Sequence, residues 1–260
     1  MGLAKIMKRK ICVPNRTIKS LPEEMLTEVL ARVASSSLTD LCNAKLSCRD
    51  FLGAADDNYI FEHASMEKFP VAPWPVSEEA SSFLRRCKEC GNAEALYREG
   101  MVEYFSKMGV DSGLEYLKRA AEKGHVEASY VYGIILLCTG GQPNQRSLEL
   151  LSGITKSLMV KSRKSRTNIR ECRRRIQAII WSIWIKNYII PPQMPRVDHA
   201  KTCMRKGKAW QDCERPMIGT EWEEDREEEG GGDDDEAVGC EACRWYYEVL
   251  SFCDMLRAGR

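Results

Sequence analysis

The first clear hydrophobic pattern of the chain begins at Met25. Apolar residues recur there every three or four positions, and charged residues occupy the other side of the same helix. Ser20 and Glu23 have the spacing of a capping box, with Pro22 in the first turn, where a missing N–H costs nothing. We therefore expect a helix that starts at Ser20 and breaks at the serine run 35–37.

The apolar pattern continues through two shorter helices as far as Leu52. The result is a compact helical unit from about Thr17 to Tyr59. Such a short segment buries only a thin core, so it gains stability from a neighbour or a partner. The proline-marked segment from Phe69 to Pro75 cannot sustain a helix and is expected to be an extended connector between domains.

A longer apolar stripe follows from Ala93 to Met108, and after a turn at Gly109 a second helix should end at Gly124. The sequence then starts again. The ten residues from 91 to 100 align with residues 124 to 133, an offset of 124 − 91 = 33, and five of the ten positions are identical. This self-similarity predicts a repeat of helix–turn–helix units whose helices approach closely at small residues, namely Ala95, Gly100, Ala128 and Gly133.

The region after the repeat is strongly basic. A further helix beginning after Ser147 should cover the end of the stack, and residues 156–175 then carry nine lysines and arginines against Glu171 alone. A nucleic-acid-binding tract would fit this charge, but no aromatic residue is interleaved for base stacking. We therefore favour a capping helix or a solvated helix face.

One apolar run, from Ile176 to Ile190, has to be weighed as a membrane span. Its 15 residues fall short of the roughly 20 that cross a bilayer, and polar residues interrupt it before Pro191 stops the helix. We expect a buried helix or a partner-binding face.

Composition points to an intracellular protein. The 260 residues include 39 basic and 38 acidic side chains, and the first 19 residues are basic without the apolar stretch of a signal peptide. The twelve cysteines are then expected to be reduced, in the nucleus or the cytoplasm, as buried apolar residues or metal ligands.

Four cysteines flank an acidic, glycine-containing segment that should lack a fold. The spacing C-x2-C of the second pair suits one tetrahedral ion, whereas the first pair is poorly spaced. His199 or Cys253 could replace one ligand, and an alternative places Cys243 and Cys253 on the apolar side of a helix. A structural zinc site is the prediction, with no other cofactor required, at Cys203, Cys213, Cys240 and Cys243.

No motif in the sequence indicates catalysis. Cys87 and Cys90 form another C-x2-C at the end of a helix, without the β–α–β pattern of a redox motif. The three histidines stand in no triad pattern, and no glycine-rich phosphate loop occurs. We therefore predict no catalytic residues and a protein that is not an enzyme.

Two segments of the chain resemble known protein families. Leu21-Pro22 with Glu24, Leu26 and Val29-Leu30, followed by Leu38, Asp40-Leu41, Lys45, Cys48 and Phe51, resembles an F-box, although Ser35-Ser36 stands where many F-boxes carry a proline. Residues 93–128, with Gly100, Gly109, Ala120-Ala121 and Gly124-His125, resemble a Sel-like repeat, a relative of the tetratricopeptide repeat. Their order resembles a plant family of F-box proteins.

This resemblance implies a mainly α protein that recruits a substrate to a cullin ubiquitin ligase of the SCF type. It implies docking on a Skp-type adaptor, and through it on a cullin, with the adaptor-binding residues Leu21, Pro22, Leu26, Leu30 and Leu41. The alternatives are a ligase-independent helical scaffold and a nucleic-acid-binding protein that uses the basic tract; no membrane partner is expected. The expected domains are a basic tail 1–16, the F-box 17–68, the connector 69–86, the repeats 87–195, and a Cys-rich segment 196–260 with an acidic loop 221–239.

Overall fold

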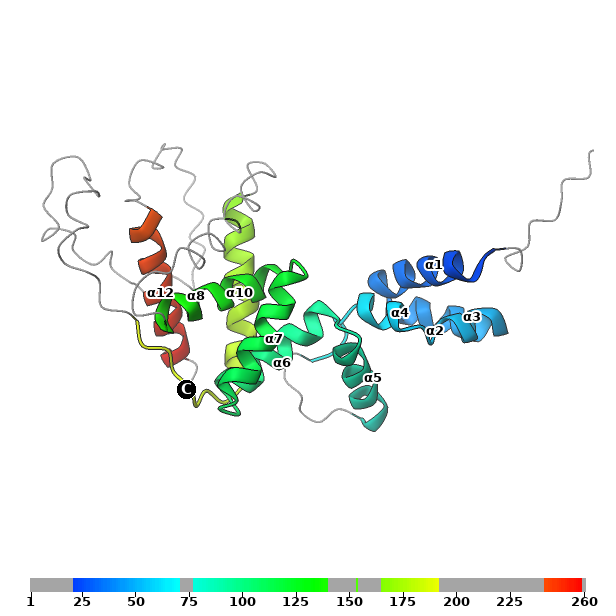
Figure 1. Cartoon of the computed structure of the whole chain (residues 1–260), viewed down its shortest axis with the longest axis horizontal. Coiled ribbons are helices and arrows are strands. Elements are labelled where there is room, and N and C mark those ends of the chain that lie inside the picture. Colours follow the sequence, from blue (N-terminus) through cyan, green and yellow to red (C-terminus); the bar gives the residue numbers. More distant parts are fainter. Residues whose placement is uncertain (1–20, 71–76, 140–152, 154–164, 192–240, 259–260) are drawn as a thin grey trace, which may run out of the picture. The chain divides into compact units, whose positions relative to one another are not determined.

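The computed structural model describes residues 21–70, 77–139, 153, 165–191 and 241–258, and these residues form ten helices and no strand (Figure 1). The mainly α fold is thereby confirmed. The chain divides into two compact units, Met1–Lys68 and Phe69–Arg260. The division falls where the proline-marked connector was expected to begin; residues 71–75 of that segment lie outside the described residues.

The first unit is built from four helices. Three polar residues start its shorter helices: the side chains of Ser37, Cys48 and Asp57 accept hydrogen bonds from the N–H groups of Asp40, Phe51 and Tyr59. Each cap satisfies an amide that the helix itself leaves unpaired. The bounds are α1 (Glu23–Ser36), α2 (Leu38–Ser47), α3 (Arg49–Ala54) and α4 (Asn58–His63).

The start of α1 differs from the predicted capping box. Ser20 lies outside the described residues, and the helix begins at Glu23 with Pro22 as its N-cap residue. The carbonyl of Pro22 accepts from the N–H groups of Met25 and Leu26, at 3.1 Å each. Proline thus stands just before the first turn rather than within it. The serine run breaks the helix as predicted, since Ser37 is extended and starts α2.

The core of the first unit is small, as its length requires. Leu26, Leu30 and Leu41 are buried, together with Ile60 and Phe61 of α4. The N–H of Ser65 donates to the carbonyl of Ala34 at 2.9 Å, which fixes the segment after α4 to α1. The unit therefore closes its core with α4, a helix that was not predicted, because the hydrophobic pattern was followed only as far as Leu52.

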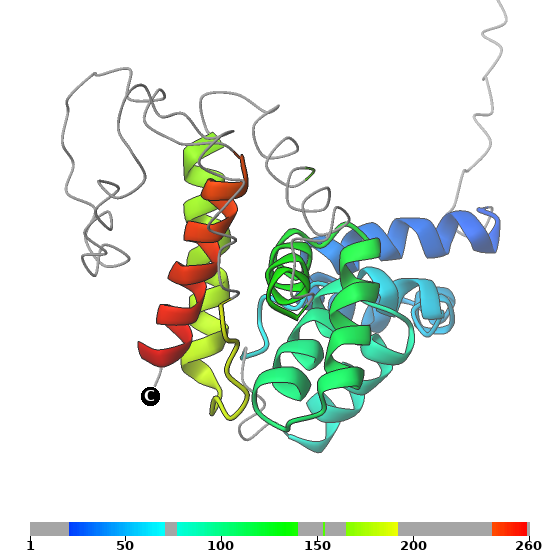
Figure 2. The same ribbon diagram turned by 60° about the vertical axis from the view of Figure 1, so that its left-hand side comes forward.

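The second unit contains the repeat. Helix α6 packs on α5 and α7, and α8 packs on α7, α10 and α12. In the view of Figure 2, α10 (yellow-green) and α12 (red) stand beside the group formed by α6 to α8. The bounds are α5 (Glu78–Glu89), α6 (Ala93–Phe105), α7 (Val110–Glu122), α8 (Val126–Thr139), α10 (Ser165–Ser182) and α12 (Glu241–Ala258).

Equivalent residues 33 positions apart have the same backbone conformation and hydrogen bonds at the two turns. Gly91 and Gly124 both have φ = +82°, the left-handed conformation that ends a helix and that glycine adopts without a Cβ penalty. The following residues, Asn92 and His125, donate their N–H groups to Cys87 and Ala120, five residues back. The repeat therefore includes α5, because Cys87 occupies the position of Ala120 (120 − 33 = 87), and both are fully buried.

Close approach of α6 and α7 depends on two glycines. A Cβ on Gly100 would lie 2.8 Å from Leu117 Cγ, and one on Gly113 would lie 2.5 Å from the backbone nitrogen of Tyr104. The packing role predicted for Gly100 is confirmed, and Gly113 is an addition. Gly133 is buried within α8. The turn between the helices places its left-handed residue at Met108 (φ = 64°), not at Gly109.

The run predicted as one helix from Ile176 to Ile190 is divided by the structure. Helix α10 ends at Ser182. The N–H groups of Lys186 and Asn187 then donate to the carbonyl of Phe105, at 2.7 and 3.1 Å, which fixes the segment after α10 to the end of α6. No helix within the described ranges has both the length and the apolarity needed to cross a membrane. Of the helix expected after Ser147, only Gly153 is among the described residues, and it is helical.

Candidate functional site

Exposed apolar residues lie on one side of α1 and at the two positions before it; we call them the α1 stripe and define it as Leu21, Pro22, Met25 and Val29. Leu21, Met25 and Val29 are 44, 53 and 46% exposed. Met25 and Val29 lie about one helical turn apart on α1, and Leu21 lies just before the helix. Pro22 is exposed beside them. Since a small domain rarely leaves several large apolar residues of one helix in water, the stripe is a candidate docking surface.

The structure separates the five predicted adaptor-binding residues into two groups. Leu21 and Pro22 lie on the α1 stripe, whereas Leu26, Leu30 and Leu41 are buried among the four helices. These three buried residues belong to the core that holds α1 against α2 and α4. They therefore fix the position of the helix that carries Met25 and Val29. Sequence reasoning placed Met25 and Val29 on the same apolar face as Leu26 and Leu30; helical periodicity alone did not distinguish the buried edge of that face from the exposed one.

Polar contacts brace α1 beside the stripe. The Glu28 carboxylate accepts from the hydroxyl of Tyr59 in α4 and, at 2.9 Å, from Arg32. These two hydrogen bonds lower the pKa of Glu28. The ring of Tyr59 in turn packs against that of His63 in a tilted arrangement, with ring centroids 4.2 Å apart. Helix α4 thereby holds α1 by surface contacts as well as through the core.

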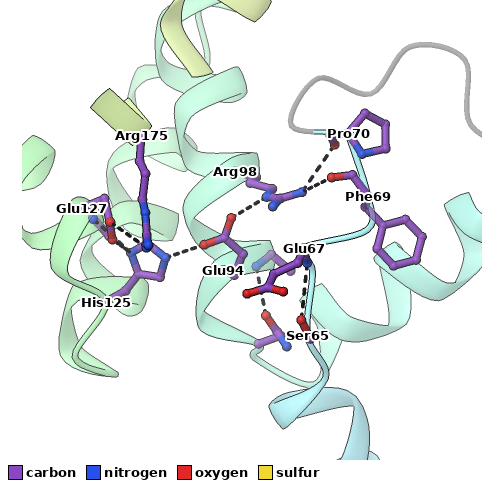
Figure 3. Close-up of polar contacts among 12 residues, drawn as sticks. Ser65, Glu67, Phe69, Pro70, Glu94, Arg98, His125, Glu127 and Arg175 are labelled. Atoms are coloured by element: carbon purple, nitrogen blue, oxygen red, sulfur yellow. Dashed lines mark hydrogen bonds and ion pairs between the residues drawn. The ribbon is translucent and has the colours of Figure 1, made fainter. Parts of the chain in front are cut away.

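The second unit contains a half-buried polar cluster around His125, shown in Figure 3. Nδ1 of His125 accepts from the N–H of Ala128 at 3.2 Å, as Asn92 Oδ1 accepts from Ala95 at 3.1 Å one repeat earlier. Because Nδ1 accepts, Nε2 carries the hydrogen and donates to Glu94 Oε2 at 2.7 Å. His125 is therefore a helix cap and an inter-repeat link, as its predicted place in the repeat turn suggested.

Glu94 extends this cluster to the start of the unit. Its other oxygen accepts from Arg98 Nε at 2.5 Å, and Arg98 also donates to the carbonyls of Phe69 and Pro70 (Figure 3). Burial alone would raise the pKa of Glu94, but the hydrogen bond from His125 and the charge of Arg98 outweigh it and lower the pKa to about 2. These contacts link α6, α8 and the start of the unit, so the cluster has a structural role.

The described end of the basic tract is paired with carboxylates. Arg173 forms an ion pair with Glu248 of α12, and Glu248 also accepts from the Tyr130 hydroxyl at 2.6 Å. Arg175 lies 3.4 Å from Glu127, a buried carboxylate of α8. Helix α10 thus uses these arginines to join α8 and α12, which agrees with the capping helix favoured over a nucleic-acid contact.

The predicted zinc ligands are not placed by the structure. Cys203, Cys213 and Cys240 lie outside the described residues, and Cys243 lies in α12 without a described side chain. In the part of the chain that is described, no group of three or more His, Cys, Asp or Glu is arranged to hold a metal. Cys253, considered as a substitute ligand, is instead buried in the core of the second unit. The zinc site stays a prediction.

Cys87 and Cys90 lie at the end of α5 and in its turn, as expected. Burial, with the nearby Cys90 as a smaller contribution, raises the pKa of Cys87 to about 12. A thiol with this pKa is protonated and unreactive at neutral pH. Cys87 is thus a small core residue at the repeat position that alanine fills in α7.

Comparisons with known proteins find a helical-repeat family and relatives with F-box names. Residues 66–181 match the family model described as plant tetratrico peptide repeats. The chain is 36% identical over 201 residues to a protein of Arabidopsis thaliana named "Putative F-box protein At1g67623", an alignment that covers 77% of this chain and 64% of that protein. The chain therefore spans a little less than two thirds of that relative.

Two further Arabidopsis relatives bear F-box names. F-box protein At2g35280 is 28% identical over 47% of this chain and 75% of its own length, and F-box protein At1g67340 is 27% identical over 50% of this chain and 35% of its own length. No solved structure matches the chain significantly. Neither the repeat family nor these relatives indicate an enzyme family. The chain is a homologue of the plant F-box proteins that carries a tetratricopeptide-type helical repeat.

Proposed function

We propose that this chain recruits a protein substrate to a cullin ubiquitin ligase of the SCF type. The first unit docks a Skp-type adaptor through the α1 stripe, and the adaptor connects the chain to a cullin. The helical repeat and the C-terminal region bind the target. The chain is a non-catalytic subunit in this proposal, and ubiquitin is transferred by other subunits.

The observation that carries this proposal is the α1 stripe itself. Its large apolar side chains lie in water on α1 and just before it, while Leu26 and Leu30 of the same helix are buried. The F-box names of the relatives support a Skp-type adaptor as the partner of this surface. Repeat helices of this kind present extended surfaces to protein partners, which supports a protein rather than a small molecule as the target.

The test is capture of a purified Skp-type adaptor by the full chain. Apolar residues at an interface centre contribute about 1 to 3 kcal/mol each when truncated, so the double change Leu21→Ala, Pro22→Ala should weaken capture at least tenfold. Val29→Ala should weaken it as well. Val110→Ala is the matched control, because Val110 is similarly exposed (40%) but lies on α7 of the other unit. Helical content measured by circular dichroism should be unchanged in all variants.

Three outcomes would count against the proposal. Unchanged capture by the folded double variant would remove the α1 stripe as the docking surface. Stable recovery of target proteins by a chain that captures neither adaptor nor cullin would favour the ligase-independent scaffold. Binding to RNA or DNA with a steep salt dependence would instead favour the basic tract as the functional region.

A further inference from the structure

Two tryptophans are exposed to solvent at the end of α10. Trp181 lies in the last turn of the helix and Trp184 just after it, and they are 50 and 79% exposed. They are three positions apart, so their Cα atoms lie within about 11 Å of each other. Lys186 follows two positions later and is also exposed. We call these three residues, Trp181, Trp184 and Lys186, the tryptophan surface.

Neither tryptophan ring belongs to the core of the second unit. Helix α10 enters that core through Ile176, Ile179 and Ile180, and Ile183 after its end is buried too. The fold therefore gives no packing reason for large aromatic rings at positions 181 and 184. Tryptophan is enriched among the residues that dominate protein interfaces. The pair thus has the composition of a binding surface rather than of ordinary solvent-facing positions.

The segment that carries Trp184 and Lys186 is held in place without a partner. The N–H groups of Lys186 and Asn187 donate to the carbonyl of Phe105, at 2.7 and 3.1 Å. The side-chain amide of Asn187 also donates to the carbonyl of Tyr104, at 3.1 Å. These three hydrogen bonds attach the segment to the end of α6. A surface that is fixed in advance loses little conformational entropy on binding.

Lys186 gives this surface a positive charge that the fold does not neutralise. Two arginines of α10, Arg173 and Arg174, each form an ion pair with a carboxylate. Lys186, by contrast, forms no ion pair within the described residues. Residues 172–191 also contain no aspartate or glutamate. A partner that covers the surface therefore gains from a carboxylate placed against Lys186.

The area of the surface decides the kind of partner. A tryptophan has about 250 Å² to bury, so the exposed parts of the two rings amount to about 320 Å². An interface between two folded proteins buries about 800 Å² on each, which makes this surface too small for a second copy of the chain. Nucleic acid needs several cations for its phosphates, whereas this surface offers Lys186 alone. A short protein segment fits both the area and the charge.

We propose that the tryptophan surface binds a short acidic segment of the target protein. Large apolar side chains of that segment cover Trp181 and Trp184, and a carboxylate of the segment pairs with Lys186. This inference rests on the proposed function, because it names the surface that a recruiting subunit uses for its target. The class of target is then a protein that carries an exposed segment of mixed apolar and acidic residues.

The experiment uses the immobilised full chain and a phage-displayed library of short random peptides. The expected result is enrichment of peptides that carry several large apolar residues and more Asp and Glu than Lys and Arg. The most enriched peptide, made synthetically, should bind the full chain in a fluorescence-polarisation assay. Trp181→Ala and Trp184→Ala should each weaken that binding at least tenfold, because tryptophans at an interface centre dominate the affinity.

Two further variants test the charge and control for position. Lys186→Glu should weaken binding of the selected peptide and strengthen binding of a version whose carboxylates are replaced by lysines, because the charge of the surface is reversed. Met108→Ala should leave binding unchanged. It is the matched control, since Met108 is similarly exposed (56%) in the same unit but lies between α6 and α7. Melting curves measured by circular dichroism should agree among all variants.

Four results would overturn the proposal. The first is the absence of any enriched peptide, and the second is a selected peptide that binds the Trp184→Ala and Lys186→Glu chains as tightly as the wild type. A monomer–dimer equilibrium that Trp184→Ala abolishes would assign the surface to a second copy. Binding of a single-stranded oligonucleotide that the same variant loses would assign the surface to nucleic acid.

Adaptor capture separates this inference from the proposed function. Trp184→Ala should capture the Skp-type adaptor as the wild type does, because the adaptor docks on the α1 stripe of the other unit. Adaptor capture without peptide binding would remove the tryptophan surface and leave the ligase subunit. Peptide binding that depends on Trp184, by a chain that captures no adaptor, would remove the ligase function and leave the tryptophan surface as a docking site.

Discussion

Gly113 is the position where a single methyl group should disturb the repeat most. A Cβ there would lie 2.5 Å from the nitrogen, 2.7 Å from the Cβ and 2.8 Å from the Cα of Tyr104. Two of these atoms belong to the backbone of α6, so no change of rotamer can make room. Gly113→Ala can be accommodated only if α6 and α7 move apart.

The expected magnitude combines two opposed effects. Alanine is the better helix former by about 1 kcal/mol, and overpacking a tight core costs about 1 to 3 kcal/mol. Because the clash is with backbone, we place the cost at the upper end and expect a net loss of about 2 kcal/mol. For a unit of this size each kcal/mol lowers the melting temperature by about 2–4 °C, so the change should be about 4–8 °C.

Tryptophan fluorescence provides the assay. All six tryptophans lie after residue 68, so their emission during urea unfolding reports the second unit alone. Gly124→Ala is the comparison: its Cβ would meet no atom within 4 Å, but the φ of +82° strains any L-residue, at a cost of about 1 kcal/mol. An unfolding midpoint for Gly113→Ala equal to or above that of the wild type would refute the packing argument.

Three further predictions concern a turn, an ion pair and the cysteine-rich segment. Met108→Gly should stabilise the second unit by about 1 kcal/mol in the same fluorescence assay, because Met108 is exposed and left-handed; a loss of stability would contradict this. The lowered pKa of Glu94 contributes stability above pH 4.5 that is lost as the pH falls toward about 2, so Glu94→Gln should flatten the pH dependence of unfolding over that interval; a wild-type slope in this variant would exclude the role. If the predicted zinc site exists, metal analysis of the purified chain should find about one zinc per molecule. That zinc should be lost in Cys240→Ser or Cys243→Ser, and its absence from the wild type would end the proposal.

The repeat could be predicted from sequence because residues with the same local role recur 33 positions apart. Gly91 and Gly124 are identical residues with the same backbone conformation, and Asn92 and His125 serve as the same kind of cap. Such features depend on a few neighbouring residues and are therefore visible in a single chain. The helix ends at both glycines followed directly from this pattern.

Features set by long-range packing could not be predicted in this way. Gly113 is required by Tyr104, which belongs to another helix, and no local pattern marks it. Helix α10 ends at Ser182 although apolar residues continue, because amides beyond its end find an acceptor in Phe105. The division of the α1 face into exposed and buried edges likewise depends on where α4 packs. Contacts that cross between helices, rather than helix formation itself, decided these outcomes.

The shared turn at Gly91 and Gly124 has a consequence for how such a chain can change in length. Each turn starts the next helix with its own cap and closes the previous helix with its own backbone contacts. The junction between Lys123 and Gly124 is therefore an insertion point. A further 33-residue repeat inserted there could continue the helical stack, because each repeat contacts only its neighbours. Related chains could then differ by whole modules, since adding one would leave the geometry of both junctions intact.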